Sequence, residues 1–128
     1  MNNGFAIAAA LLGAAAVVLG AFGEHALASM VAASRLDTWS TAVDYHLAHA
    51  VVLLVLGLNG REMNMLWHRR SCWLFLVGIA VFSGSLYLLV LTDTPVLGAV
   101  TPIGGVLLIA GWLSLAIGLS RPAFESRS

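Results

Sequence analysis

The residues that could take part in chemistry are concentrated in a few short stretches of an otherwise apolar chain. His46 and His49 are three residues apart, and Tyr45 and His49 are four apart, so a helix would place each pair on one face. Asp44 directly precedes this group. The remaining candidates are Glu24, His25, Ser83, Ser85, Tyr87 and Thr101. Such side chains relay protons, coordinate metals or form buried hydrogen-bond networks.

The spacing of these residues argues against metal and enzyme chemistry. His46 and His49 form an HxxH pair, which lacks the HxxxH or HExxH spacing of a zinc site. Many small residues in the first apolar segment indicate close helix packing rather than a haem-sized cavity between His25 and His49. Serine, histidine and aspartate are present, but no nucleophile-elbow motif is. We therefore expect no catalytic residue, no metal ligand and no cofactor.

The composition indicates an integral membrane protein. The chain has 128 residues, of which 60% are hydrophobic and 9% charged, and its net charge is zero. About a quarter of the residues of a soluble domain are charged. This composition excludes a disordered chain, an ordinary cytosolic enzyme and a nucleic-acid-binding protein.

Four segments are long and apolar enough to span a bilayer, which takes about 20 residues per helix. We expect helices at about 4–27, 38–59, 70–92 and 101–120, in a single four-helix transmembrane domain that covers residues 1–128. Two interpretations of residues 28–38 stay open: a short helix in the membrane surface, or an extension of the first helix followed by a loop. The predicted fold class is an all-α, integral membrane four-helix bundle.

The distribution of arginine predicts the orientation, because cytoplasmic connections carry an excess of positive charge. With four spans, the connection 59–70 and the C-terminal tail lie on the same side as the N-terminus. That side has five arginines and the opposite side has one, so we expect both termini to be cytoplasmic. The five are Arg61, Arg69, Arg70, Arg121 and Arg127, and the one is Arg35. His68, beside two of these arginines, is interpreted as an interfacial residue.

This topology would bring the polar candidates together in the outer half of the membrane. The first helix ends there, the second begins there, the third carries its serines and Tyr87 late in the span, and the fourth begins with Thr101. A polar group that faces hydrocarbon without a partner costs several kcal/mol. We therefore expect His25 and His49 to face the interior in one network with at least one of Asp44, Ser83, Ser85, Tyr87 and Thr101.

The same residues carry a family resemblance. GAFGEHAL at 20–27, YHLAHA at 45–50, FSGSLY at 82–87 and TPIGG at 101–105 occur in an order that resembles the YgdD-like family of small bacterial membrane proteins, a domain of unknown function. The resemblance implies a multi-pass protein of the bacterial inner membrane and no particular reaction. Glu24 stands where the family usually has a small residue, and His46 where glutamine is common, so the resemblance favours His25 and His49 as site residues.

Three functions remain open at this point. The first is a non-enzymatic membrane component whose polar layer binds a lipid headgroup, a small ligand or a partner helix. The second is a proton or small-solute pathway, for which an oligomer could serve. The third is an intramembrane metal protein or enzyme, which the spacing of the residues favours least. Membrane lipids and a second copy or another membrane protein are the expected partners, and nucleic acid is not.

Overall fold

The computed structural model describes residues 3–60 and 63–121, and these form helices and short connections without any strand. The long helices are α1 (Gly4–His25), α2 (Ala33–Asn59), α3 (Met65–Thr92) and α4 (Thr101–Leu119). Two 3-10 turns, η1 (Leu27–Ser29) and η3 (Pro95–Ala99), precede α2 and α4. Within the described residues, four helical segments are long and apolar enough to cross a membrane, as predicted.

Two helices begin earlier than their hydrophobic segments. The sequence predicted starts near Thr38 and Arg70, whereas α2 begins at Ala33 and α3 at Met65. The side chain of Asn64 accepts a hydrogen bond from the backbone N–H of Leu66, which caps α3 in the polar connection. A hydropathy pattern marks the apolar span, while hydrogen bonding lets a helix continue beyond it.

The connection between α1 and α2 differs from both interpretations left open for residues 28–38. It consists of the 3-10 turn η1, a short bend and the first turns of α2. The hydroxyl of Thr38 donates to the carbonyl of Ser34, so the polar residues at the start of α2 already have helical partners. No separate helix in the membrane surface is present between α1 and α2.

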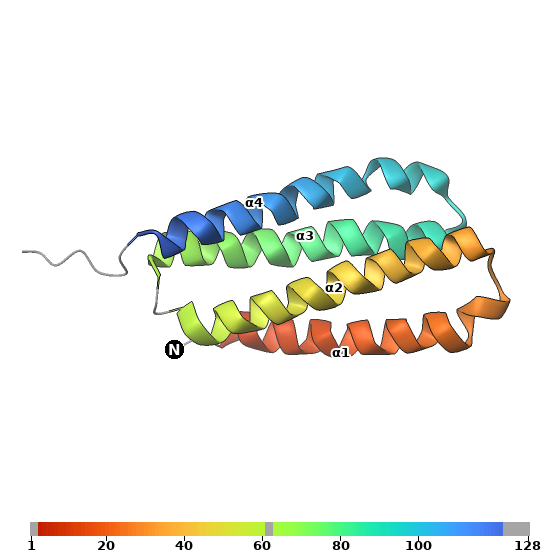
Figure 1. Ribbon diagram of the computed structural model, residues 1–128, viewed down its shortest axis with the longest axis horizontal. Coiled ribbons are helices and arrows are strands. Elements are labelled where there is room, and N and C mark those ends of the chain that lie inside the picture. The colour runs from red at the N-terminus through yellow and green to blue at the C-terminus, as the bar shows by residue number, and fades with distance from the viewer. Residues whose placement is uncertain (1–2, 61–62, 122–128) are drawn as a thin grey trace, which may run out of the picture.

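The four helices form two antiparallel hairpins that pack against each other. Figure 1 shows them side by side in chain order, with α1 and α4 at the two edges and α2 and α3 between them. The α1–α2 and α3–α4 connections lie together at what we call the loop end. The start of α1, the α2–α3 connection and the end of α4 lie at the opposite, terminal end.

Small residues set the close approach within each hairpin. A Cβ atom at Gly57 would lie 2.6 Å from the backbone nitrogen of Ala6, so α1 and α2 nearly touch there. A Cβ atom at Gly104 would collide with the backbone of Phe82, where α3 meets α4. At Gly84, by contrast, an added Cβ would have nothing within 4 Å. Glycine at positions 57 and 104 therefore lets the paired helix backbones approach closely, as is common between membrane helices.

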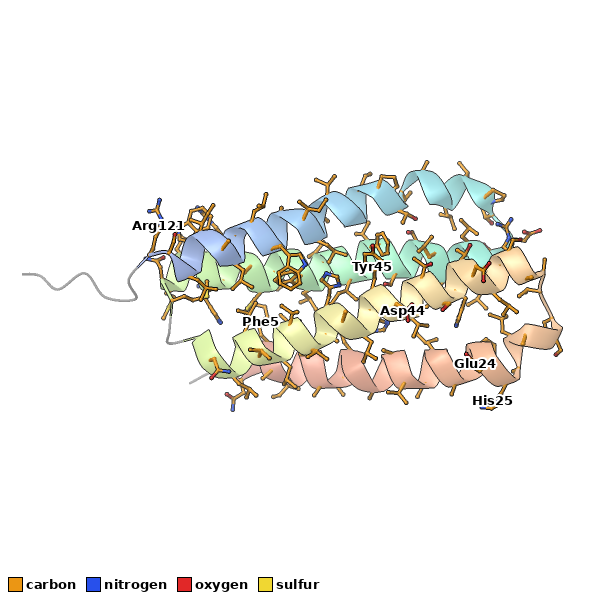
Figure 2. All side chains as sticks on the ribbon, viewed as in Figure 1. Phe5, Glu24, His25, Asp44, Tyr45 and Arg121 are labelled. Carbon is orange, nitrogen blue, oxygen red and sulfur yellow. The ribbon has the colours of Figure 1, made fainter. Side chains whose placement is uncertain are left out.

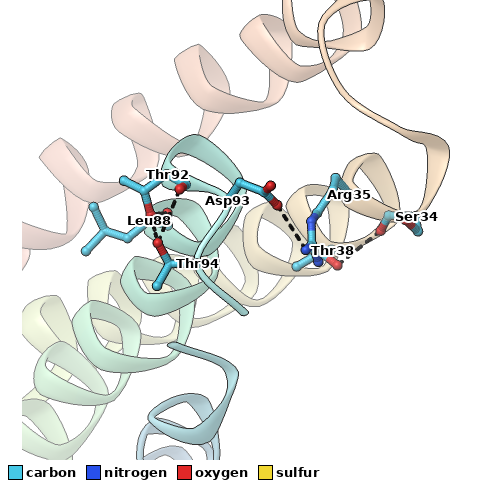
Figure 3. Close-up of polar contacts among 7 residues, drawn as sticks. All are labelled: Ser34, Arg35, Thr38, Leu88, Thr92, Asp93 and Thr94. Atoms are coloured by element: carbon cyan, nitrogen blue, oxygen red, sulfur yellow. Dashed lines mark hydrogen bonds and ion pairs between the residues drawn. The ribbon is translucent and has the colours of Figure 1, made fainter. Parts of the chain in front are cut away.

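An ion pair joins the two hairpins at the loop end (Figure 3). The guanidinium of Arg35, in the first turns of α2, lies 3.1 Å from the carboxylate of Asp93, the residue that follows α3. Asp93 has a φ of 49°, and its backbone N–H donates to the carbonyl of Leu89. An aspartate tolerates this left-handed conformation better than most residues. The Arg35 side chain is 31% exposed and the Asp93 side chain 84%, so the pair adds little to the stability of the fold.

Candidate functional site

His49 on α2 is held at both ring nitrogens. The indole N–H of Trp112 on α4 donates to Nε2 over 3.1 Å, and Nδ1 lies 2.7 Å from the backbone carbonyl of Tyr45. Because Nε2 accepts and a carbonyl can only accept, Nδ1 must carry the proton. His49 is therefore a neutral imidazole with both nitrogens engaged, and it is only 8% exposed.

His46, one turn earlier, has one partner. Its Nδ1 lies 2.8 Å from the hydroxyl of Tyr87 on α3, and the residue is 4% exposed. The backbone of Leu12 on α1 lies near the imidazole. The Nε2 of His46 is nevertheless buried and lacks a well-formed hydrogen bond to any described group. His46 is thus the one histidine of the interior with a free ring position.

Three hydroxyl side chains complete the interior set. The hydroxyl of Ser83 donates to the backbone carbonyl of Ala42 over 2.7 Å, which ties α3 to α2. Ser85 and Thr101 share a 2.7 Å hydrogen bond between α3 and α4. Each of the three hydroxyls donates to a backbone carbonyl. The acceptor is Ala42 for Ser83, Phe82 for Ser85 and Leu97 for Thr101. We call His46, His49, Ser83, Ser85, Tyr87, Thr101 and Trp112 the interior polar set.

The interior polar set spreads along the helices instead of occupying one depth. Thr101 is the first residue of α4, at the loop end. His49 lies 16 residues after the start of α2 and 10 before its end, about 24 Å and 15 Å along the helix axis. The prediction of a single layer placed His49 too near the loop end, because it counted α2 from Thr38.

The acidic and histidine residues at the end of α1 lie outside this set. His25 and Glu24 are exposed, and Figure 2 shows His25 pointing away from the other three helices. The expectation that His25 and His49 share one network is therefore wrong. His25 is the last residue of α1, at the loop end, whereas His49 lies about 24 Å along α2 from the start of that helix, so the two imidazoles differ in depth as well as in direction.

Asp44 is exposed on α2, although it lies 11 residues after the start of a membrane-spanning helix. Among the described residues no hydrogen bond or ion pair reaches the carboxylate of Asp44. The nearest cation along α2, Arg35, is paired with Asp93 instead. Asp44 lines a cavity of about 350 Å³ between α1 and α2, together with Glu24, Asp37 and Ser40. Trp39 forms part of the wall, with its indole N–H bonded to the carbonyl of Leu19.

Tyr45 lies between the interior and the surface. Its side chain is 45% exposed, while its ring stacks on His49, with centroids 5.9 Å apart and planes 14° apart. A second ring contact joins Tyr45 to Phe82 of α3, at 4.5 Å. Tyr45 therefore covers one side of the His49 ring while its own side chain stays partly exposed.

Two contributors were missed in the sequence. The first is Trp112, for which the sequence does contain a signal, because an indole N–H in an apolar helix needs a hydrogen-bond partner. His68 was interpreted as merely interfacial, yet its Nε2 bonds to the carbonyl of Leu56 over 2.7 Å and so satisfies one of the last carbonyls of α2. Cys72, 3.7 Å from the same nitrogen, is fully buried.

The chemistry open to this arrangement is limited. Within the described residues no group of three or more histidine, cysteine or acidic side chains could hold a metal ion. His49 has no free nitrogen with which to accept a proton from a substrate. The interior polar set thus links α2, α3 and α4, whereas Glu24 and Asp44 remain free to contact a molecule in the α1–α2 cavity.

Helix length, hydropathy and architecture define an all-α, multi-pass membrane protein. The family described as a protein of unknown function (DUF423) matches residues 19–105, and the chain belongs to this family. The relatives below all carry the name UPF0382 membrane protein, so the broader expectation of a small-membrane-protein family without a known function is confirmed.

A relative from Staphylococcus saprophyticus, SSP2132, is 45% identical and covers 89% of this chain and 94% of its own. YwdK of Bacillus subtilis is 39% identical, over 88% and 93% of the two chains. A relative from Haemophilus influenzae is 38% identical and covers 100% of this chain and 99% of its own. No solved structure matches the chain.

Proposed function

We propose that this protein is a YgdD-like, non-enzymatic component of the bacterial inner membrane that binds an ammonium-bearing lipid headgroup in the α1–α2 cavity. In this proposal both termini are cytoplasmic and the cavity opens toward the periplasmic face. The interior polar set fixes the register of the helices, and the acidic residues beside it make the binding contacts.

The observation that carries the proposal is the unpaired carboxylate of Asp44. An ionisable side chain within a membrane-spanning helix is costly, and it is normally paired or functional. Asp44 has no described partner, and it faces a cavity that also receives Glu24 and Asp37. Asp37, Ser40 and Asp44 recur at helical spacing along α2, so the polar wall runs from the helix start into the span. A small cation entering from the interface would neutralise these carboxylates.

Lipid retention tests this binding function. Protein released gently from membranes would be analysed by native mass spectrometry with phosphatidylethanolamine supplied as the probe. We expect the wild type to retain this lipid and Asp44→Asn to retain several-fold less. Asp93→Asn is the matched control, because it removes a carboxylate from the loop end but not from the cavity. Equal retention by wild type and Asp44→Asn would refute the proposal, and a bound metal lost in His49→Leu would favour a metal protein instead.

Thiol labelling tests the orientation. In a Cys72→Ser background, cysteines at Glu62 and Glu125 should be protected from an impermeant reagent in intact cells, and one at Asp93 should be labelled. The reverse pattern would place the α1–α2 cavity on the cytoplasmic side and overturn the proposed topology.

A proton pathway is the second candidate, and one observation favours it. The free Nε2 of His46 is a position where a proton could arrive or leave. His49, the next histidine along α2, has both nitrogens engaged and would interrupt such a path. Vesicles that contain the protein and a pH-sensitive dye should show proton flux no faster than protein-free vesicles. Flux that disappears in His46→Gln would establish the pathway.

A further inference from the structure

A second surface groove begins at the terminal end of the molecule, whereas the α1–α2 cavity lies nearer the loop end. It has a volume of about 490 Å³, and its walls come from α3 and from Leu107 of α4. The α3 residues recur three or four positions apart, so they form one stripe along the helix. They include Arg69, Arg70, Trp73, Leu74 and Val77.

This stripe is the face of α3 that α2 and α4 leave open to the surroundings. Trp73 is 52% exposed and Val77 is 42% exposed, whereas Cys72 and Phe75 on other faces are fully buried. Trp73 is held in place by an edge-to-face contact with Phe5 of α1, with ring centroids 5.4 Å apart. The groove therefore has a rigid aromatic wall near its mouth and an aliphatic wall deeper in the span.

Two unpaired cations stand at the mouth of this groove. Arg69 and Arg70 are exposed, and neither makes an ion pair with a described residue. Arg70 lies over the ring of Trp67 at 4.9 Å, and Arg121 approaches the same ring at 5.7 Å. The described acids Glu24, Asp37, Asp44 and Asp93 all belong to α1, α2 or the α3–α4 connection nearer the loop end. The described residues of the terminal end thus offer concentrated positive charge next to an apolar surface.

We propose that this groove binds an anionic phospholipid. The phosphate lies between Arg69 and Arg70, and one acyl chain runs along Trp73, Leu74, Val77 and Leu107. Arginine pairs with phosphate through parallel N–H donors, and basic pockets beside membrane helices favour anionic headgroups. The seven helical steps from Arg70 to Val77 give about 10 Å of wall, which matches the upper part of an acyl chain. This site is independent of the α1–α2 cavity.

Native mass spectrometry of the full chain, titrated with phosphatidylglycerol or phosphatidylcholine, tests the proposal. We expect wild type to retain phosphatidylglycerol about tenfold better than phosphatidylcholine, because each nearby arginine adds attraction for an anionic lipid. The double variant Arg69→Gln/Arg70→Gln should lose this preference, and Arg69→Lys/Arg70→Lys should keep most of it. Arg35→Gln, a charge removal at the loop end, is the matched control and should bind like wild type.

Two further measurements test the part of the site that would bind the acyl chain. Glycerol phosphate, which carries the anionic group without chains, should not displace the bound phospholipid at equal concentration. Val77→Trp, which fills the apolar wall without a change of charge, should weaken phosphatidylglycerol binding several-fold. Equal retention of the two phospholipids by wild type, or full preference in the Gln double variant, would overturn the proposal. Preference lost equally in Arg35→Gln would show general charge attraction rather than a site.

Discussion

His49 and His25 are the same residue type in two very different surroundings, one inside the bundle and one on its surface. Both were predicted to face the interior, and both belong to motifs of the same family resemblance. His49 lies between α2 and α4 with both nitrogens engaged, whereas His25 is exposed at the end of α1. The interior polar set therefore links α2, α3 and α4, whereas Glu24 of α1 and Asp44 of α2 line the cavity between α1 and α2. Polarity within a membrane span marks importance, but it does not distinguish a structural role from a binding role.

The largest loss of stability is expected at the close contact between α3 and α4. Gly104→Ala should destabilise the protein by about 3 kcal/mol, because the new Cβ meets the backbone of Phe82 and overpacks the α3–α4 crossing. The matched control is Gly84→Ala on α3, where an added Cβ has nothing within 4 Å and should leave stability unchanged or slightly raised. Unfolding in mixed detergent micelles, followed by circular dichroism, measures both. Equal effects would mean that this crossing is not closely packed.

The next largest effect concerns the His49–Trp112 link. His49→Leu should cost about 1.5 kcal/mol, the upper end for a hydrogen bond between membrane helices, because the indole N–H of Trp112 loses its acceptor. Trp112→Phe should also destabilise, and the double variant should lose less than the sum of the two single losses. Strict additivity in this cycle would show that the two side chains do not interact.

A smaller effect is expected for the Ser85–Thr101 bond near the loop end. Ser85→Ala and Thr101→Val should each cost about 0.6 kcal/mol, the average for such bonds within membranes. Each hydroxyl also has a backbone carbonyl partner, so its loss leaves little unsatisfied. The same unfolding measurement applies. A loss as large as that of His49→Leu would move the structural centre of the interior polar set to the loop end.

The smallest effect on stability is expected for the exposed histidine at the end of α1. His25→Leu should change the unfolding free energy by less than about 0.5 kcal/mol, because no described contact depends on this imidazole. His68→Leu serves as a comparison with His25→Leu. Because His68 bonds to the carbonyl of Leu56, its loss should destabilise the protein where α2 meets α3. If His25→Leu unfolded the protein as His49→Leu does, α1 would have to be rotated from its position here.

The class of protein, the number of spanning helices and the inward position of His49 could all be predicted from the amino-acid sequence. These properties follow from local quantities: the transfer of apolar side chains into lipid depends on each segment alone, and a buried imidazole needs partners wherever it lies. The starts of α2 and α3 were missed because a helix extends past its apolar segment when its first turns find polar partners.

The direction in which each polar side chain faces could not be predicted, because it depends on how the four helices pack together. The rotation and register of a helix depend on contacts between segments distant in the chain, such as Gly57 with Ala6 and Gly104 with Phe82. These contacts turn His25 outward, bring Trp112 to His49 and leave Asp44 in a cavity. The hydropathy of a single segment contains no information on the rotation of that segment against its neighbours, because lipid solvates all of its apolar faces equally well.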